Sequence, residues 1–156
     1  MRIDSVLLAE GIATDARGAF TAVGVNQKII SSAALPFAVK QNLVLIFTDE
    51  SDESEFTSPE GKDFSVSVRL LDPDGQASFA VSQPLPKVKK SWVDLPSLMN
   101  LVVEVSVSGN RYGKYSLVAA LQEKGVDQEK KVITLFVTPA LDLTSASPER
   151  PGKAFG

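Results

Sequence analysis

The chain has 156 residues, of which 44 % are hydrophobic and 22 % are charged, a composition typical of one soluble globular domain. Its net charge of −3 argues against nucleic acid as a partner, because binding to the phosphate backbone requires clustered lysine and arginine. The sequence contains no cysteine and no histidine, which excludes disulfides, thiolate chemistry, zinc thiolate sites and the commonest general base.

The N-terminal stretch MRIDSVLLAEGIATD does not have the pattern of a secretory signal. Asp4 and Glu10 interrupt its apolar run, and it has no basic leader followed by a small-residue cleavage site. No apolar run approaches the roughly 18 residues of a membrane-spanning helix. The sequence therefore predicts a cytoplasmic protein that does not bind membranes, either free in the cytosol or carried by a particle assembled there.

In the first third of the chain, apolar segments predict three strands. Residues 3–12 form the first, and the acidic turn DARG at 15–18 reverses the chain into a second over 19–25, with an extension through 30. Residues 39–48 contain the run LVLIF, which is apolar on both faces. Because such a strand is buried on both sides, this segment is predicted to be central in its sheet.

After residue 62, apolar and polar residues alternate with a period of two, which predicts strands with one buried face and one solvent face. Strands of this kind belong to antiparallel sheets. The turns DPDG at 72–75 and GNRYG at 109–113 separate them. The predicted strands are residues 63–71, 76–82, 98–108, 114–123 and 131–138.

Together these segments predict an all-β fold, an antiparallel two-sheet β-sandwich of about eight or nine strands, with a barrel as the alternative. Residues 83–96 contain three prolines and predict a long crossing between the two sheets. The β-sandwich domain is expected over residues 1–138. Residues 139–156 contain three further prolines and predict a flexible C-terminal tail.

Several short motifs occur in a characteristic order. They are the opening LLAE of Leu7 to Glu10, the DARG turn, Gly24, the DPDG turn, and the segment Gly113, Lys114, Tyr115. Over residues 3–137 this order resembles a bacterial family of small all-β proteins of unknown function. The chain departs from the family pattern in having Glu10 for aspartate, GKY for a P-G-R-Y-like turn, and an acidic insert at 49–55. The resemblance implies a stand-alone β-sandwich and supplies no activity, ligand or catalytic residue.

The sequence lacks the motifs of familiar catalytic sites. It has no G-x-S-x-G elbow and no S-x-x-K pair, and the absence of histidine excludes a Ser–His–Asp triad. The segment GNRYGK at 109–114 resembles a phosphate-binding loop, but it is one residue short and joins two predicted strands. Paired carboxylates of the glycosidase kind stay open, because acidic residues are plentiful. We therefore expect a protein that is not an enzyme and carries no cofactor.

The acidic stretch DESDESE at 49–55 directly follows the apolar run, and residues 49–63 carry a net charge of −6. It does not fit an EF-hand, because Ser54 stands where the sharp turn requires glycine. The acidic turn at 72–75 lies at the other end of the next predicted strand, roughly 25 Å away at about 3.3 Å per residue, so the two cannot share an ion. Three interpretations remain: a solvated loop, a docking surface for a basic partner, and a weak divalent-cation site.

If the chain reverses at each turn, the acidic stretch shares one end of the fold with the turn at 15–18, the crossing at 83–96 and the turn at 124–130. We therefore expect a non-catalytic protein-interaction or adaptor module that binds a protein partner at this end. The alternatives are a self-assembling structural subunit, as in a phage or other protein shell, and a weak cation or carbohydrate binder. The candidate interaction surface consists of Asp49, Glu50, Asp52, Glu53, Glu55, Lys87, Lys89, Lys90 and Trp92.

Overall fold

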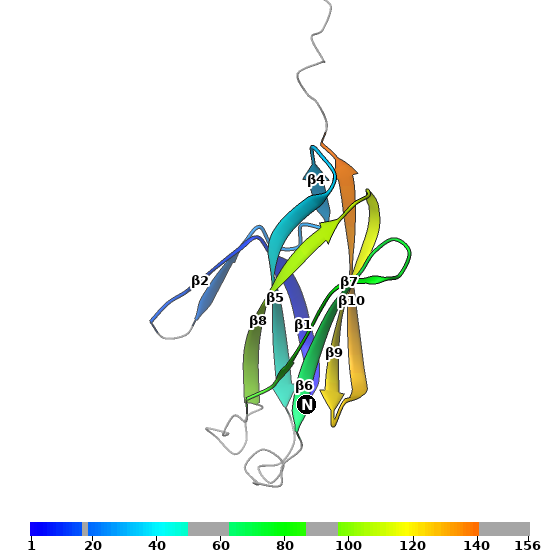
Figure 1. Ribbon diagram of the computed structural model, residues 1–156. Coiled ribbons are helices and arrows are strands. Elements are labelled where there is room, and N and C mark those ends of the chain that lie inside the picture. Colours follow the sequence, from blue (N-terminus) through cyan, green and yellow to red (C-terminus); the bar gives the residue numbers. More distant parts are fainter. Residues whose placement is uncertain (17–18, 50–62, 87–96, 141–156) are drawn as a thin grey trace, which may run out of the picture.

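The computed structural model describes residues 1–16, 19–49, 63–86 and 97–140 of the chain. These residues form ten β-strands in three sheets, and no helix occurs among them (Figure 1). The prediction of an all-β fold is confirmed, with ten strands in place of eight or nine.

The three-stranded sheet has the order β1 (Arg2–Ala9), β5 (Phe37–Asp49) and β8 (Ser97–Gly109). Both of its pairings are antiparallel. β5 is the central strand, as its run of apolar residues predicted. Its consecutive residues Leu43, Val44 and Leu45 are all fully buried, although neighbouring side chains point to opposite faces of a strand. β5 is therefore covered on both of its faces.

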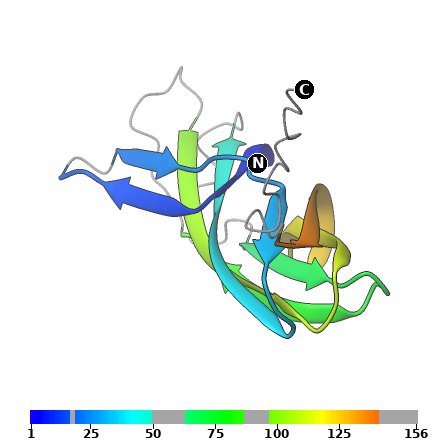
Figure 2. The ribbon, with the colours of Figure 1, turned by 90° about the horizontal axis from the view of Figure 1, so that it is seen from above.

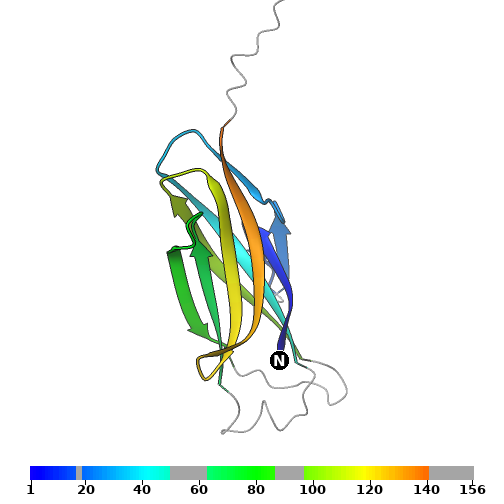
Figure 3. The same ribbon diagram turned by 90° about the vertical axis from the view of Figure 1, so that its right-hand side faces the viewer.

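The five-stranded sheet has the order β4 (Ile29–Ser32), β10 (Val126–Pro139), β9 (Gly113–Glu123), β6 (Phe64–Leu71) and β7 (Ala77–Pro84). It curls into a half-barrel (Figure 3). Its pairings are antiparallel except that β4 runs parallel to β10, so the prediction of purely antiparallel sheets is wrong for this pair. The parallel pairing arises because residues 24–28 carry the chain over to the edge of β10 before β4 begins.

The third sheet is a two-stranded hairpin of β2 (Gly11–Thr14) and β3 (Phe20–Val23), which projects from the side of the body (Figure 2). The sequence predicted strands over 3–12 and 19–30, and the structure divides each of them. The second strand breaks where Gly24 and Asn26 take positive φ angles of 65° and 60°. A side chain at Gly24 would also lie within 2.9 Å of the Glu10 carboxyl group. The positive φ angles turn the chain away from the hairpin, and the nearby Glu10 side chain leaves no room for a Cβ at residue 24.

The three-stranded sheet and the half-barrel share one hydrophobic core. The period-two alternation seen in the sequence is confirmed on β6, β8, β9 and β10, because the predicted inward side chains are buried or partly buried against the core. The chain passes from β7 in one sheet to β8 in the other, as predicted for the proline-rich crossing. The fully buried core includes Ile3, Leu8, Leu43, Leu45, Phe47, Val66, Val68, Leu70, Val105, Val107, Tyr115, Leu117, Leu121, Leu135 and Val137.

The edges of β1 and β10 lie side by side without a ladder of backbone hydrogen bonds. A side chain bridges them: the Ile3 backbone N–H donates to Glu129 Oε2 at 2.7 Å. Glu129 also pairs with Lys131 at 3.0 Å. Partial burial by itself would raise the pKa of Glu129, but the Ile3 hydrogen bond and the Lys131 charge outweigh it and lower that pKa. The carboxylate therefore satisfies a backbone donor that the sheet leaves unpaired.

One end of the core is closed by Tyr115 on β9. Its hydroxyl donates to the Arg111 carbonyl at 2.9 Å, and its ring meets Phe37 edge-on with the ring centroids 5.7 Å apart. A hydroxyl bonded to a carbonyl a few residues upstream resembles the tyrosine corner of β-sandwich proteins. The hydroxyl also explains why residue 109 is glycine, since a Cβ there would lie 2.2 Å from Tyr115 Oη.

The first prediction concerns this close approach. Gly109→Ala should lower the free energy of unfolding by about 2 kcal/mol, because the new methyl group overlaps the Tyr115 hydroxyl. Tyr115→Phe alone should cost about 1 kcal/mol for the lost hydrogen bond. In the double variant the main overlap is gone, so its destabilisation should be smaller than the sum of the two by about 1 kcal/mol. Urea unfolding of the four proteins measures this coupling, and strictly additive effects would contradict it.

Candidate interaction site

The structure places one residue of the predicted interaction surface, Asp49, and the rest lie outside the described residues. Those others are Glu50, Asp52, Glu53, Glu55, Lys87, Lys89, Lys90 and Trp92. Asp49 is the last residue of β5, and its side chain is only 2 % exposed. The expectation that Asp49 begins a solvated loop is therefore corrected.

Asp49 is buried because it has a charged partner. The antiparallel register of β1 on β5 sets Arg2 opposite Thr48, which brings the N-terminal ammonium of Met1 to 3.3 Å from Asp49 Oδ1. A carboxylate that is removed from water needs such a partner, since an isolated buried charge is strongly destabilising. Asp49 therefore has a structural role at the end of β5. The local sequence could not show this role, because the partner of Asp49 is 48 residues away.

The predicted grouping of turns at one end is confirmed in part. The β9–β10 turn is tighter than the expected 124–130, because Lys124 and Gly125 both take positive φ, as a two-residue hairpin turn requires. The Lys124 N–H donates to the Asp63 carbonyl at 3.3 Å, so this turn does lie at the end where β6 begins. Asp15, the first residue of the predicted turn at 15–18, follows β2 of the projecting hairpin instead, and residues 17 and 18 lie outside the described residues.

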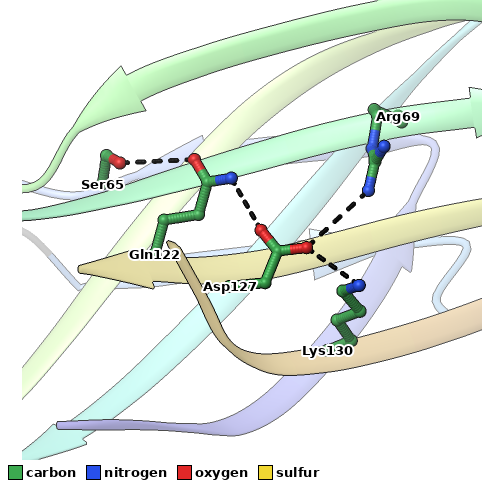
Figure 4. A network of polar contacts seen from close by, with 5 residues as sticks. All are labelled: Ser65, Arg69, Gln122, Asp127 and Lys130. Atoms are coloured by element: carbon green, nitrogen blue, oxygen red, sulfur yellow. Dashed lines mark hydrogen bonds and ion pairs between the residues drawn. The ribbon is translucent and has the colours of Figure 1, made fainter. Parts of the chain in front are cut away.

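A polar network lies on the outer face of the half-barrel near the β9–β10 turn (Figure 4). Asp127 is at its centre, where one carboxylate oxygen accepts from Gln122 at 2.7 Å and the other pairs with Lys130 at 2.9 Å and Arg69 at 4.0 Å. Ser65, which lies on β6 as Arg69 does, donates to Gln122 Oε1 at 3.5 Å. The network joins side chains of three neighbouring strands.

The charges around Asp127 indicate a structural role for this network. The hydrogen bonds from Lys130 and then Gln122 lower the pKa of Asp127, with a further contribution from Arg69. A carboxyl group with a lowered pKa stays ionised at neutral pH, so it has no proton to donate as a general acid. The contacts of Asp127 with Gln122, Lys130 and Arg69 tie the strands β6, β9 and β10 together.

The hairpin of β2 and β3 is the most distinct surface feature of the described chain. It is a separate sheet of two short strands, and Figure 2 shows it extending beyond both larger sheets. Asp15 shapes its tip, because both the backbone N–H and the carboxylate of Asp15 bond to Ala19 at 2.8 and 3.0 Å. Val23 near its base is 61 % exposed, and Val25 just beyond is also exposed. Val23 is thus an exposed apolar side chain of the hairpin itself, and Val25 adds a second one next to it.

Other apolar side chains are exposed at strand positions on the two larger sheets. Within the described part of the chain, β8 is hydrogen bonded on one edge only, to β5, and presents Leu98 and Val102 to solvent. On the half-barrel, Ile29 of β4 is the register partner of Phe136 of β10, and both are exposed. Exposed apolar surface beside an unpaired edge marks a strand that another chain can contact.

Comparison with protein-family models and with curated proteins finds no match for this chain. In the described part, no group of three or more acidic side chains is arranged to hold a metal ion. No helix of that part has the length and apolar character needed to cross a membrane.

The sequence reasoning missed the hairpin as a separate element. A signal was present, because Gly11 and Gly24 interrupt the apolar pattern of the two segments around the DARG turn. Glycine inside a predicted strand indicates a bulge or a close approach of another chain segment. The structure shows the close approach, since Glu10 packs against Gly24 at the base of the hairpin.

The second prediction concerns the pH dependence of the Asp127 network. Because the pKa of Asp127 is lowered in the folded protein, the network stabilises the fold above the ordinary pKa of aspartate, and the effect is lost as the pH falls through the lowered value. Asp127→Asn should therefore reduce the melting temperature at pH 7, and the difference from wild type should shrink below about pH 4. Asp4→Asn is the control, because its partner Arg2 lies 3.9 Å away on an exposed surface and such pairs contribute little. A pH-independent effect of Asp127→Asn would contradict the prediction.

Proposed function

We propose that the protein is a non-catalytic protein-interaction module, with the two larger sheets forming a β-sandwich and the β2–β3 hairpin serving as its docking element. The observation that carries this proposal is the projection of the hairpin as a separate sheet with the exposed Val23 near its base (Figure 2). The partner is a protein, and the setting is the cytoplasm.

A hairpin of two short strands lacks hydrogen-bond partners at its outer edges. An isolated two-stranded sheet is at most marginally stable in water, because its backbone groups on both outer edges and both of its faces meet solvent. A strand added from another chain would satisfy the edge groups by backbone hydrogen bonds, the mode of recognition called β-augmentation. Val23 would then supply apolar contact area beside the new strand.

The third prediction tests this docking element with a matched pair of variants. Val23 on the hairpin and Val126 on the half-barrel are both 61 % exposed, so Val23→Lys and Val126→Lys make the same chemical change at equal exposure. Neither should shift the melting temperature by much, since surface substitutions usually change stability by less than about 0.5 kcal/mol. A partner isolated from host lysate should be lost with Val23→Lys and retained with Val126→Lys.

Hydrogen exchange identifies the contact directly. In the purified complex, amide exchange should slow at residues 11–14 and 20–23, because the hairpin amides gain hydrogen-bond partners or are shielded from water. A partner that binds Val23→Lys normally and protects a different surface would contradict the hairpin as the docking element.

A self-assembling structural subunit is the second candidate, and the edge of β8 favours it. β8 and the hairpin are separate elements that each have an unpaired edge, so one copy can contact two others. Contacts between two different surfaces of identical chains produce rings or filaments. Light scattering over a range of concentrations distinguishes the candidates, because self-assembly requires the mass to rise without any partner.

A further inference from the structure

A cavity of about 540 Å³ lies at the end of the fold opposite the β9–β10 turn. It is bordered by the first residues of β5, the turn after β6, β7, the end of β8 and the start of β9. Its volume is within the range of sites that hold small molecules, roughly 300–1,000 Å³. Its apolar floor consists of the exposed residues Pro36 and Ala38 over the buried rings of Phe37 and Tyr115, and Asp72, Ser78, Ser108 and Asn110 are its polar groups.

Asp72 is the one charged side chain that lines the cavity. Its Oδ1 is occupied, because it accepts the backbone N–H groups of Asp74 and Gln76 at 2.9 and 2.8 Å. These bonds hold the carboxylate in a fixed orientation at the turn. The nearest guanidinium, on Arg111, pairs with Asp74. Asp72 therefore gives the cavity a negative charge that no lining lysine or arginine neutralises.

The effect of this charge extends to the floor. Burial raises the pKa of the Tyr115 hydroxyl, and the Asp72 carboxylate raises it further because a second negative charge nearby is unfavourable. The hydroxyl thus stays protonated and donates to the Arg111 carbonyl. The floor is neutral and apolar, and the negative charge is at the turn after β6.

Three classes of ligand fit the lining poorly. An anion would face Asp72, and no lysine or arginine lines the cavity to pair with it. A Ca²⁺ ion needs six to eight oxygen ligands, and no cluster of acidic side chains suited to a metal occurs in the described residues. A sugar stacks on exposed aromatic faces, but Phe37 and Tyr115 are at most 4 % exposed. What remains is an organic cation with an apolar portion.

We propose that this cavity binds an aliphatic primary ammonium group, with Asp72 as its counter-ion and the apolar floor in contact with its alkyl chain. The hydroxyls of Ser78 and Ser108 and the amide oxygen of Asn110 supply further acceptors at the cavity wall. An ammonium group carries three N–H donors, so it can use the carboxylate and two of these oxygens together. The chemistry is shared by a free alkylamine and by a lysine side chain of another protein. The site uses none of the hairpin residues, so a test of ligand binding at the cavity is independent of any test of the proposed docking element.

The fourth prediction tests this proposal with n-butylammonium as the probe and n-butanol as its neutral counterpart. Saturable chemical-shift changes should appear with n-butylammonium at the amides of Ser78, Ser108 and Asn110, all of which line the cavity. Asp72→Asn should weaken binding at least tenfold, since it removes the negative charge that pairs with the ammonium group. This variant keeps the side-chain oxygen that accepts from Asp74 and Gln76, so the turn should stay folded.

Asp4→Asn is the control, because it removes an equal charge from an exposed ion pair outside the cavity lining. It should leave the affinity for n-butylammonium within about twofold of wild type, as expected for an exposed ion pair. Equal binding of n-butanol, unchanged binding by Asp72→Asn, or no saturable shifts with n-butylammonium would each overturn the proposal. N-acetyl-lysine methylamide distinguishes the two sources: tighter binding than n-butylammonium indicates a protein lysine, and weaker binding indicates a free amine.

Discussion

The strands β5, β6, β8, β9 and β10 all direct alternate apolar side chains into one interior, and β5 is covered on its second face as well. Each fully buried valine or leucine contributes about 1.5–3 kcal/mol by leaving water, so this shared interior dominates the stability of the fold. It also sets the orientation of both large sheets, because a shift of one residue in register would turn an entire apolar face to solvent. The other features of the protein lie where this interior ends.

Polar side chains form stabilising contacts at the two ends of the fold and where the edges of β1 and β10 meet. Glu129 bridges from β10 to the backbone of β1, where the edges of the two sheets meet without a hydrogen-bonded ladder. Asp49 is buried with the N-terminal ammonium at the end of β5, and the Asp127 network joins three strands on the outer face (Figure 4). At the opposite end, Tyr115 closes the core and at the same time forms the floor of a cavity. Stabilising contacts and the candidate ligand site therefore share residues there.

The hairpin and the cavity are two different kinds of surface. Among the described residues, the hairpin strands pair only with each other and expose Val23, which suits another polypeptide. The cavity offers one carboxylate above an apolar floor, which suits a small cationic group. If the ammonium group belongs to a lysine, both surfaces serve one interaction module. If it belongs to a free amine, the module would also respond to a small molecule.

The sequence by itself determined the all-β class, the central position of β5, and which side chains of β6, β8, β9 and β10 face the core. These are local properties, because a period of two along a strand assigns each side chain to a face before any partner strand is known. Only the tertiary structure decided that β4 runs parallel to β10, that Asp49 is buried, and that the chain around the DARG turn leaves the body as a hairpin. Each depends on a contact between distant residues, such as Met1 with Asp49, or on backbone angles such as those of Gly24 and Asn26. The cavity has the same origin, since Phe37, Asp72 and Asn110 meet only when four strand ends are brought together around one core.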